Sequence, residues 1–413
     1  MSGEADDSWE VRPLGDLFAV NTPGHWGDEP DGDGNVLVLR STNFRKTGGL
    51  VYETAASRQF DERRLVQKRL QPGDIILERS GGSPAQPVGR ARRFEAEGCY
   101  SASNFMQIMR PSERADDRFI CYLLDHIYAK GMTEPLQKAT TGIRNLDFKA
   151  YLELPVCVPP LDEQRRIADV LRSVEVVQEQ TLLALDRLKD LKQGALHNAL
   201  IHDPLPQGWR LALIEELGAK SKHAIVDGPF GSNLKSEHYR SSGIPVFQSG
   251  FVTSSQFKPT KYVFVEEALF KQQIRSRAVG GDILMAKIGA QAGRCAIIPS
   301  DHEEGIIAGN CLKITLDTDL CSNEFLHAVL TYMYGVTGLR EIITETAQPA
   351  ISLARLKKLQ VPLPPLGEQH VIMEGVRALD AAYQAEVQKH SQLMELKSCL
   401  AADLLSGRVR VPA

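Results

Sequence analysis

Apolar residues recur at a helical spacing directly after Pro160 in this 413-residue chain. An alternating spacing of three and four between apolar and small residues is typical of one side of a coiled-coil helix. Pro204 and Pro206 end the pattern, so it predicts a helix of about 40 residues, roughly 60 Å long at 1.5 Å per residue. The predicted seam is formed by Val174, Val177, Thr181, Ala184, Leu188, Leu191 and Ala195.

A second segment of the same kind runs from Leu366 to Leu405, and Gly407 follows it as a C-terminal stop. A single amphipathic helix of this length must bury its apolar side against something. We expect the two helices to pack on each other, antiparallel, because the globular region between them brings the chain back. The second seam keeps Leu393, Leu396 and Leu400 at the positions equivalent to Leu188, Leu191 and Ala195, with Glu386 and Lys389 in a weaker middle.

Both helices begin with one short string, PPLDEQ at Pro159–Gln164 and PPLGEQ at Pro364–Gln369, 205 residues apart. Two prolines end a strand, a leucine supplies an apolar contact, and a glutamate in the first helical turn suits the helix dipole. This favours a helix-start role over a catalytic Glu/Gln pair. The residues concerned are Pro160, Leu161, Glu163 and Gln164 in the first copy, and Pro365, Leu366, Glu368 and Gln369 in the second.

The stretches before the two strings also correspond. Each half predicts a strand with a turn, a β-branched strand entering a polar turn, a Gly-Asp turn feeding an apolar strand, a further strand pair, a helix and a returning strand. This correspondence places Asn104 opposite Asn310, whereas Val226–Tyr239 has no clear counterpart in the first half. The pairs are 9–17 and 208–217, 35–44 and 244–252, 70–82 and 279–294, 99–111 and 305–316, 117–131 and 322–335, and 152–160 and 356–365.

The repeat therefore predicts an α+β fold in which a globular domain and a long helix occur twice, with an intramolecular pseudo-twofold axis. The predicted domains are residues 1–155 and 205–360, and the predicted helical segments are residues 156–204 and 361–413.

Composition is ordinary for a soluble globular protein, with 43% apolar and 24% charged residues. The seven cysteines are scattered, which is typical of reduced thiols, and no zinc spacing indicates a metal site. The chain shows neither an apolar run of membrane-spanning length nor a signal peptide at its acidic start, so a cytoplasmic location is the expectation.

The net charge is only −4, but basic and acidic residues are concentrated in different parts of the chain. Between Arg40 and Arg93 there are twelve Lys and Arg residues against five Asp and Glu residues, an excess of seven positive charges. From Lys258 to Arg294 the excess is four, from seven basic and three acidic residues. Each half therefore contains one basic region.

Catalysis by this chain alone is disfavoured, because the sequence has no phosphate-binding loop, no amino-methyltransferase tetrapeptide and no nucleophile elbow. DNA binding is favoured, because Arg and Lys contact phosphates and guanine while Asn and Gln pair with adenine. For any single residue, an ordinary solvated loop charge is the alternative; the recurrence in both halves favours function. The candidate DNA-binding residues are Arg40, Ser41, Asn43, Arg45, Lys46, Arg79, Ser80, Arg90, Arg92, Arg93, Ser232, Asn233, Lys235, Tyr239, Gln248, Ser249, Lys287, Gln291 and Arg294.

The duplicated order of globular region, strand, Pro-Pro-Leu-x-Glu-Gln and long helix resembles the specificity subunit of type I restriction–modification systems. LRSTNF, PGDIILERSGG, GGDILMAKIGAQAGR and DGPFGSNLKSEHY belong to the match, which covers nearly the whole chain. The first half departs from the pattern, because it lacks a DGPFGS-like string.

The resemblance implies two target recognition domains, each reading one half of a bipartite double-stranded DNA site. It implies that the two helices act as a spacer and dock two modification (methyltransferase) subunits and restriction subunits. Those partners would use S-adenosylmethionine, ATP and magnesium to methylate adenine and cleave DNA, and this chain would hold no cofactor or metal. Two alternatives stay open: a coiled-coil scaffold with two protein-binding domains, and a recognition module of a related phage-defence system.

Overall fold

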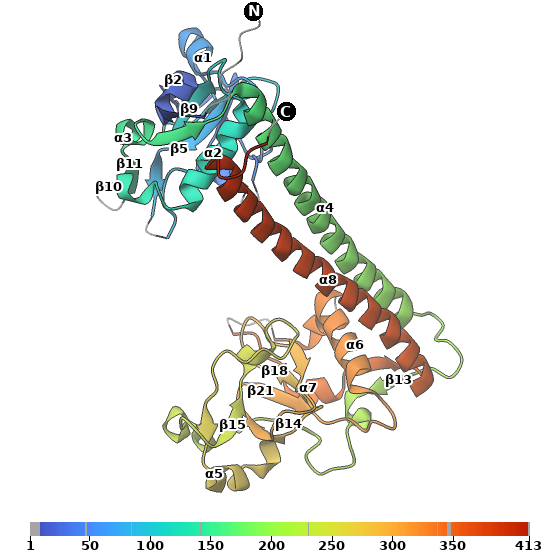
Figure 1. Ribbon diagram of the computed structural model, residues 1–413. Coiled ribbons are helices and arrows are strands. Elements are labelled where there is room, and N and C mark those ends of the chain that lie inside the picture. The colour runs from blue at the N-terminus through green and yellow to red at the C-terminus, as the bar shows by residue number, and fades with distance from the viewer. Residues whose placement is uncertain are drawn as a thin grey trace, which may run out of the picture. The chain divides into compact units, whose positions relative to one another are not determined.

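The computed structural model describes residues 9–45, 48–83, 85–140, 143–229, 231–336, 338–344 and 348–411. The chain divides into two compact units: residues 1–182 with 388–413 form unit 1, and residues 183–387 form unit 2. The long helices are α4 (Leu161–Leu200) and α8 (Leu366–Leu405), as predicted, and each contributes to both units (Figure 1). Within the described ranges, no helix has the length and apolar character needed to cross a membrane.

Unit 1 combines small sheets with short helices. Its largest sheet has the strand order β2-β9-β5-β7; a second joins β4, β3 and β8, a third joins β10, β11 and β6, and β1 pairs with β12. The elements before α4 are β1 (Glu10–Pro13), β2 (Phe18–Pro23), β3 (Val36–Leu39), β4 (Ala56–Arg58), α1 (Glu62–Lys68), β5 (Ile75–Glu78), β6 (Ser80–Gly82), β7 (Ala91–Arg93), β8 (Tyr100–Ala102), β9 (Met106–Pro111), α2 (Asp117–Ala129), β10 (Gln137–Thr140), β11 (Ile143–Leu146), α3 (Phe148–Leu152) and β12 (Pro155–Val158).

Unit 2 repeats this plan with two four-stranded sheets, β14-β21-β18-β19 and β16-β15-β20-β17, and with the pair β13-β22. Its elements between α4 and α8 are β13 (Arg210–Leu213), β14 (Ile225–Asp227), β15 (Ile244–Phe247), β16 (Phe264–Val265), α5 (Glu267–Gln272), β17 (Arg277–Ala278), β18 (Ile283–Ala286), β19 (Cys295–Ile297), β20 (Gly305–Ile307), β21 (Cys311–Ile314), α6 (Asn323–Val336), α7 (Leu353–Lys357) and β22 (Gln360–Leu363).

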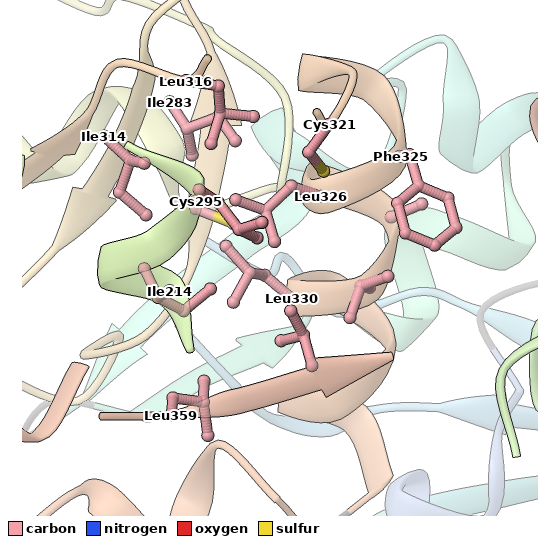
Figure 2. Close-up of a cluster of buried hydrophobic side chains, with 14 of the residues drawn as sticks. Ile214, Ile283, Cys295, Ile314, Leu316, Cys321, Phe325, Leu326, Leu330 and Leu359 are labelled. Carbon is pink, nitrogen blue, oxygen red and sulfur yellow. The ribbon is translucent and has the colours of Figure 1, made fainter. Parts of the chain in front are cut away.

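One apolar core lies between the first of these sheets and α6 in unit 2. Figure 2 shows Leu326 and Leu330 of α6 beside Ile283 and Ile314 of the sheet, and all four side chains are buried. The equivalent core of unit 1 packs α2 against β5 and β9. Burial of this kind is the main driving force that holds helix and sheet together. The α+β class and the duplicated plan predicted from the sequence are therefore confirmed.

The Gly-Asp turn before β5 and β18 is fixed by its aspartate. Gly73 and Gly281 have φ values of +93° and +91°, which glycine adopts without steric cost. The Asp74 carboxylate accepts a hydrogen bond from the backbone N–H of Gln71 at 2.8 Å, and it binds the Arg110 guanidinium at 2.7 and 2.8 Å. Asp74 is fully buried, so the turn depends on this pair.

The glutamine of each Pro-Pro string fastens the start of its long helix to the globular part of its unit. Both side chains are buried, and each makes the same three hydrogen bonds to backbone groups. The partners, all at 2.9–3.0 Å, are the N–H of Asp116 and the carbonyls of Arg114 and Pro159 for Gln164, and the N–H of Ser322 and the carbonyls of Leu320 and Pro364 for Gln369.

In each Pro-Pro string, the glutamate that precedes the glutamine lies in the first turn of the long helix, as predicted. Glu163 accepts a hydrogen bond from the Trp9 indole at 3.0 Å, and Glu368 accepts one from the Trp209 indole at 2.7 Å. In unit 1 the guanidinium of Arg410 also binds Glu163, at 2.8 and 2.7 Å. Hydrogen bonding from Arg410 is the largest cause that holds the pKa of Glu163 below its ordinary value.

The two long helices pack antiparallel, as predicted, but the predicted seam is wrong at four positions, which are exposed: Val177, Leu191, Ala195 and Leu396. Leu191 and Leu396 are 58% and 48% exposed, whereas the half-buried positions next to them are lysines. Lys192 binds Asp380 at 2.6 Å in unit 2, and Lys397 binds Glu175 at 2.5 Å in unit 1. A lysine stem can cover apolar surface while its ammonium group is paired, which apolar spacing alone does not predict. The seam of α4 follows Leu171, Val174, Gln178, Thr181 and Leu185, and Ala195 and Val177 lie outside it.

Candidate nucleic-acid interface

In each unit, a pair of parallel strands ends beside several of the predicted DNA-binding residues. In unit 1 β3 runs parallel to β8, and in unit 2 β15 runs parallel to β20. The carboxyl ends of parallel strands lie at the same edge of a sheet. We call the segments there the carboxyl edge: residues 40–41, 79–80 and 103–105 in unit 1, and residues 248–249, 287 and 308–310 in unit 2.

Backbone hydrogen bonds join these segments in the same way in both units. Because the bonds involve the main chain, they fix the edge independently of the side chains that it carries. In unit 1, Ser103 N–H donates to Leu39 O, and Arg79 N–H and Ser80 N–H both donate to Phe105 O, at 2.9–3.0 Å. In unit 2, Ala308 N–H donates to Phe247 O at 2.9 Å, and Lys287 N–H donates to Asn310 O at 2.8 Å.

These bonds correct one predicted correspondence. Phe105, and not Asn104, occupies the position of Asn310, because Phe105 O and Asn310 O accept the equivalent bonds from Arg79 and Lys287. Sequence similarity favoured the asparagine, one residue earlier. Backbone pairing therefore decides the register where side-chain identity does not.

The segment around Asp227–Gly228 has a partial counterpart that the sequence did not reveal. Gly24 follows β2 as Gly228 follows β14, and its N–H donates to Met106 O at 2.9 Å, as that of Gly228 does to Cys311 O at 3.1 Å. A Cβ atom at Gly24 would overlap the carbonyl oxygen of Ala102, and one at Gly228 would overlap that of Ala308. Close backbone approach therefore requires glycine at both places.

Two arginines at the carboxyl edge of unit 1 have no carboxylate partner among the described residues. The Arg40 guanidinium lies over the Trp26 ring, 5.6 Å from its centroid, and Arg79 donates to the side-chain oxygen of Gln107 at 3.2 Å. Both side chains are half-exposed, as are those of Ser41 and Ser80. Cations that are not neutralised within the protein can bind phosphates or guanine edges.

The other candidates of unit 1 are placed differently. Arg90, Arg92 and Arg93 bind carboxylates of Glu78, Asp125 and Asp117 at 2.8–2.9 Å, so their charges are neutralised internally. Asn43 is fully buried and holds its own loop through Arg40 N–H, Val51 O and Thr54 Oγ1, so in this structure its amide is not exposed to a ligand. Arg45 is exposed on the adjoining hairpin, and Lys46 lies outside the described residues.

At the carboxyl edge of unit 2 the chemistry is that of amides and hydroxyls. Asn310 is exposed and donates from Nδ2 to Ser249 Oγ at 2.8 Å, and Gln248 beside it is half-exposed. Lys287, by contrast, is only 8% exposed, and its ammonium group binds Asp227 at 2.9 Å. Arg275 binds the other oxygen of Asp227 at 2.6 Å. Neither Asp227 nor Arg275 was among the predicted site residues, although an aspartate before Gly-Pro was visible in the sequence.

The remaining candidates of unit 2 lie outside the residues that define the carboxyl edge. Asn233, Lys235 and Gln291 are exposed, and Lys235 lies 3.7 Å from Glu237. Tyr239 packs on the core of β15 and β20, where burial raises its pKa. Arg294 lies over the Tyr334 ring at 5.0 Å. Ser232 falls in a short 3-10 turn (Gly231–Asn233), and its side chain lies outside the described part of the structure.

Comparison with known proteins connects this arrangement to a family. The model of the "Type I restriction modification DNA specificity domain" matches residues 6–185 and 231–395. The MjaVIII specificity subunit of a type I restriction enzyme from Methanocaldococcus jannaschii is 21% identical over 75% of this chain and 74% of its own length. The specificity subunit of the EcoKI type I restriction enzyme from Escherichia coli is 22% identical over 80% of this chain and 73% of its own length.

A solved structure shares the fold over the whole chain. The S subunit of a type I restriction–modification system from M. genitalium covers 98% of this chain and 98% of its own, with 16% identity and a TM-score of 0.54.

Proposed function

This chain belongs to the family of type I restriction modification DNA specificity domains, and from this premise we propose that each carboxyl edge contacts one half of a bipartite DNA target. The chain is the DNA specificity subunit of a type I restriction–modification system, a component without catalytic activity or a catalytic cofactor of its own. Its contribution to the system is the choice of sequence.

The observation that supports two half-sites is the repetition of one backbone arrangement with different side chains. Equivalent main-chain hydrogen bonds hold the edge together in each unit. Unit 1 presents Arg40 and Arg79, whereas unit 2 presents Gln248 and keeps Lys287 buried against Asp227. A constant frame with variable side chains is what a protein needs to read two different sequences in the same way.

We further propose that α4 and α8 dock two modification subunits, and that restriction subunits join that complex. The modification subunits would supply S-adenosylmethionine and methylate adenine, and the restriction subunits would supply ATP and magnesium-dependent cleavage. The repeated helices support two copies of one partner, because each unit contributes an equivalent surface of the helix pair.

Salt-dependent DNA binding tests the carboxyl edge. In the complex with modification subunits, we expect the Arg40→Gln, Arg79→Gln double variant to bind target DNA more weakly at every salt concentration. The slope of log affinity against log salt concentration should fall by about 1–2, because each phosphate contact contributes about 0.9 to that slope. Arg114→Gln, an exposed change outside the carboxyl edge and outside both long helices, is the matched control and should leave the slope unchanged. An unchanged slope in the double variant would contradict the assignment of the edge.

Helix length tests the proposed spacer. Deleting one heptad from each long helix, residues 178–184 and 383–389, retains both the Glu175–Lys397 and Lys192–Asp380 pairs. We expect the gap between half-sites to shorten by about three base pairs, because seven helical residues span about 10 Å. Methylation-site sequencing would report the gap. The half-sites themselves should stay the same, and an unchanged gap would refute the spacer role.

A further inference from the structure

A four-residue turn carries the tip of the carboxyl edge in both units. In unit 1 it joins β8 to β9, and Met106 N–H donates to Ser103 O at 2.9 Å. In unit 2 it joins β20 to β21, and Cys311 N–H donates to Ala308 O at 2.9 Å. The same closing hydrogen bond therefore defines the turn in both units.

The third residue of this turn differs in chemistry between the units. It is Phe105 in unit 1, where the ring is 48% exposed, and Asn310 in unit 2, where the amide is exposed. The carbonyl of each is held by N–H groups from the end of β5 or β18. The backbone that carries each side chain is therefore tied to the end of the neighbouring strand.

The surroundings of Phe105 make its exposure informative. Single exposed apolar residues are common on protein surfaces and need no function. Phe105, however, stands next to Asn104 and is bonded through its backbone to Arg79 and Ser80, so an apolar ring lies within a polar and cationic edge. The equivalent position of unit 2 is occupied by Asn310, whose side-chain amide is oriented by a hydrogen bond from Nδ2 to Ser249 Oγ at 2.8 Å.

Phenylalanine and asparagine are side-chain types that recognise thymine and adenine, respectively. In the major groove the thymine methyl group is contacted by apolar side chains such as phenylalanine, and adenine N6 and N7 are bound by asparagine. The bond from Asn310 Nδ2 to Ser249 uses one of its two N–H groups, and the amide oxygen accepts a weak hydrogen bond from Cys311 Sγ at 3.6 Å. One N–H and the second lone pair of the oxygen remain for such a contact.

On the basis of the proposed function, we propose that the third residue of the turn is a base-reading position in both units. Phe105 packs on a thymine methyl group in the half-site contacted by unit 1. Asn310 hydrogen-bonds an adenine in the half-site contacted by unit 2. Removal of exposed ring surface from water favours the first contact, and paired donor and acceptor groups favour the second.

Methylation-site sequencing of a host that expresses the complete complex tests this inference. We expect Phe105→Ala to reduce discrimination for thymine at one position of one half-site by about tenfold, the scale of a single mismatched base pair. Phe105→Leu, which keeps an apolar contact, should largely retain the preference. Asn310→Ala should relax an adenine position in the other half-site only. Val66→Ala, an exposed apolar change on α1, is the matched control and should change neither half-site.

The outcomes are distinguishable from failure of the proposed function. If the unaltered complex methylates no bipartite site, both proposals fall. If it does, but Phe105→Ala and Asn310→Ala leave both half-sites and their base preferences unchanged, the base-reading position alone is refuted. Equal loss of methylation at every site by a variant with normal thermal unfolding would also refute it, because that result indicates a contact with another subunit.

Discussion

Replacing Gln369 with leucine should lower the free energy of unfolding by about 3 kcal/mol, because a buried backbone group left without its partner costs about 1–3 kcal/mol. Three such groups depend on this side chain: the N–H of Ser322 and the carbonyls of Leu320 and Pro364. Leucine fills a similar volume, so the loss reports the hydrogen bonds and not a cavity. Urea unfolding followed by tryptophan fluorescence measures the difference.

The repeat supplies an internal replicate for this experiment. Gln164→Leu removes the equivalent three bonds in unit 1 and should cost a similar amount. Gln384→Leu, an exposed change on α8, is the matched control and should remain within about 0.5 kcal/mol of the parent protein. If all three variants unfolded alike, the glutamine of the Pro-Pro string would have no role in fastening the helix.

Asp74→Ala should have an effect of similar size, a loss of about 3 kcal/mol, because breaking a buried ion pair from one side commonly costs 3–5 kcal/mol and Arg110 retains some contact with water. The change also removes the bond from Asp74 to Gln71 N–H, which closes the turn before β5. Since β5 leads directly to Arg79, the carboxyl edge of unit 1 should lose order as well.

An exposed ion pair provides the comparison for the buried Asp74–Arg110 pair. Asp162 binds Arg165 at 3.1 Å on the surface of α4, and Asp162→Ala should change stability by no more than about 1 kcal/mol. Thermal unfolding of both variants, with hydrogen exchange of residues 75–82 as a local probe, provides the comparison. A loss for Asp74→Ala no larger than that for Asp162→Ala would show that the buried pair is not what holds the turn.

Much of the fold follows from the sequence because its repeat and its periodicities are local signals. The helices α4 and α8, the strand β5 with its Gly-Asp turn and the amphipathic α2 all lie within the predicted segments. Short elements such as α1, α3 and the sheet of β6, β10 and β11 were not predicted, because they depend on tertiary contacts more than on pattern.

The predictions that failed concern details that are decided by which side chains and backbone groups pair in the folded chain. The seam of the helix pair shifts to Lys192 and Lys397 because acids on the other helix pair with them. The register at Asn310 is set by backbone bonds, which side-chain identity does not encode. The partners of Asn43 and Arg90 are close in the sequence, but residue type alone does not show that the loop buries Asn43 or that Glu78 pairs with Arg90. Residue type therefore indicated a basic DNA-binding region, and the structure was needed to select within it.

Methylation-site sequencing of DNA from a host that expresses this chain with its modification subunits tests the central claim most directly. We expect methylated adenine in a target of two specified half-sites separated by a fixed number of unspecified base pairs. Substitutions at the carboxyl edge of one unit should alter one half-site and leave the other intact. Methylation confined to a single continuous sequence, or no methylation that depends on this chain, would contradict the account.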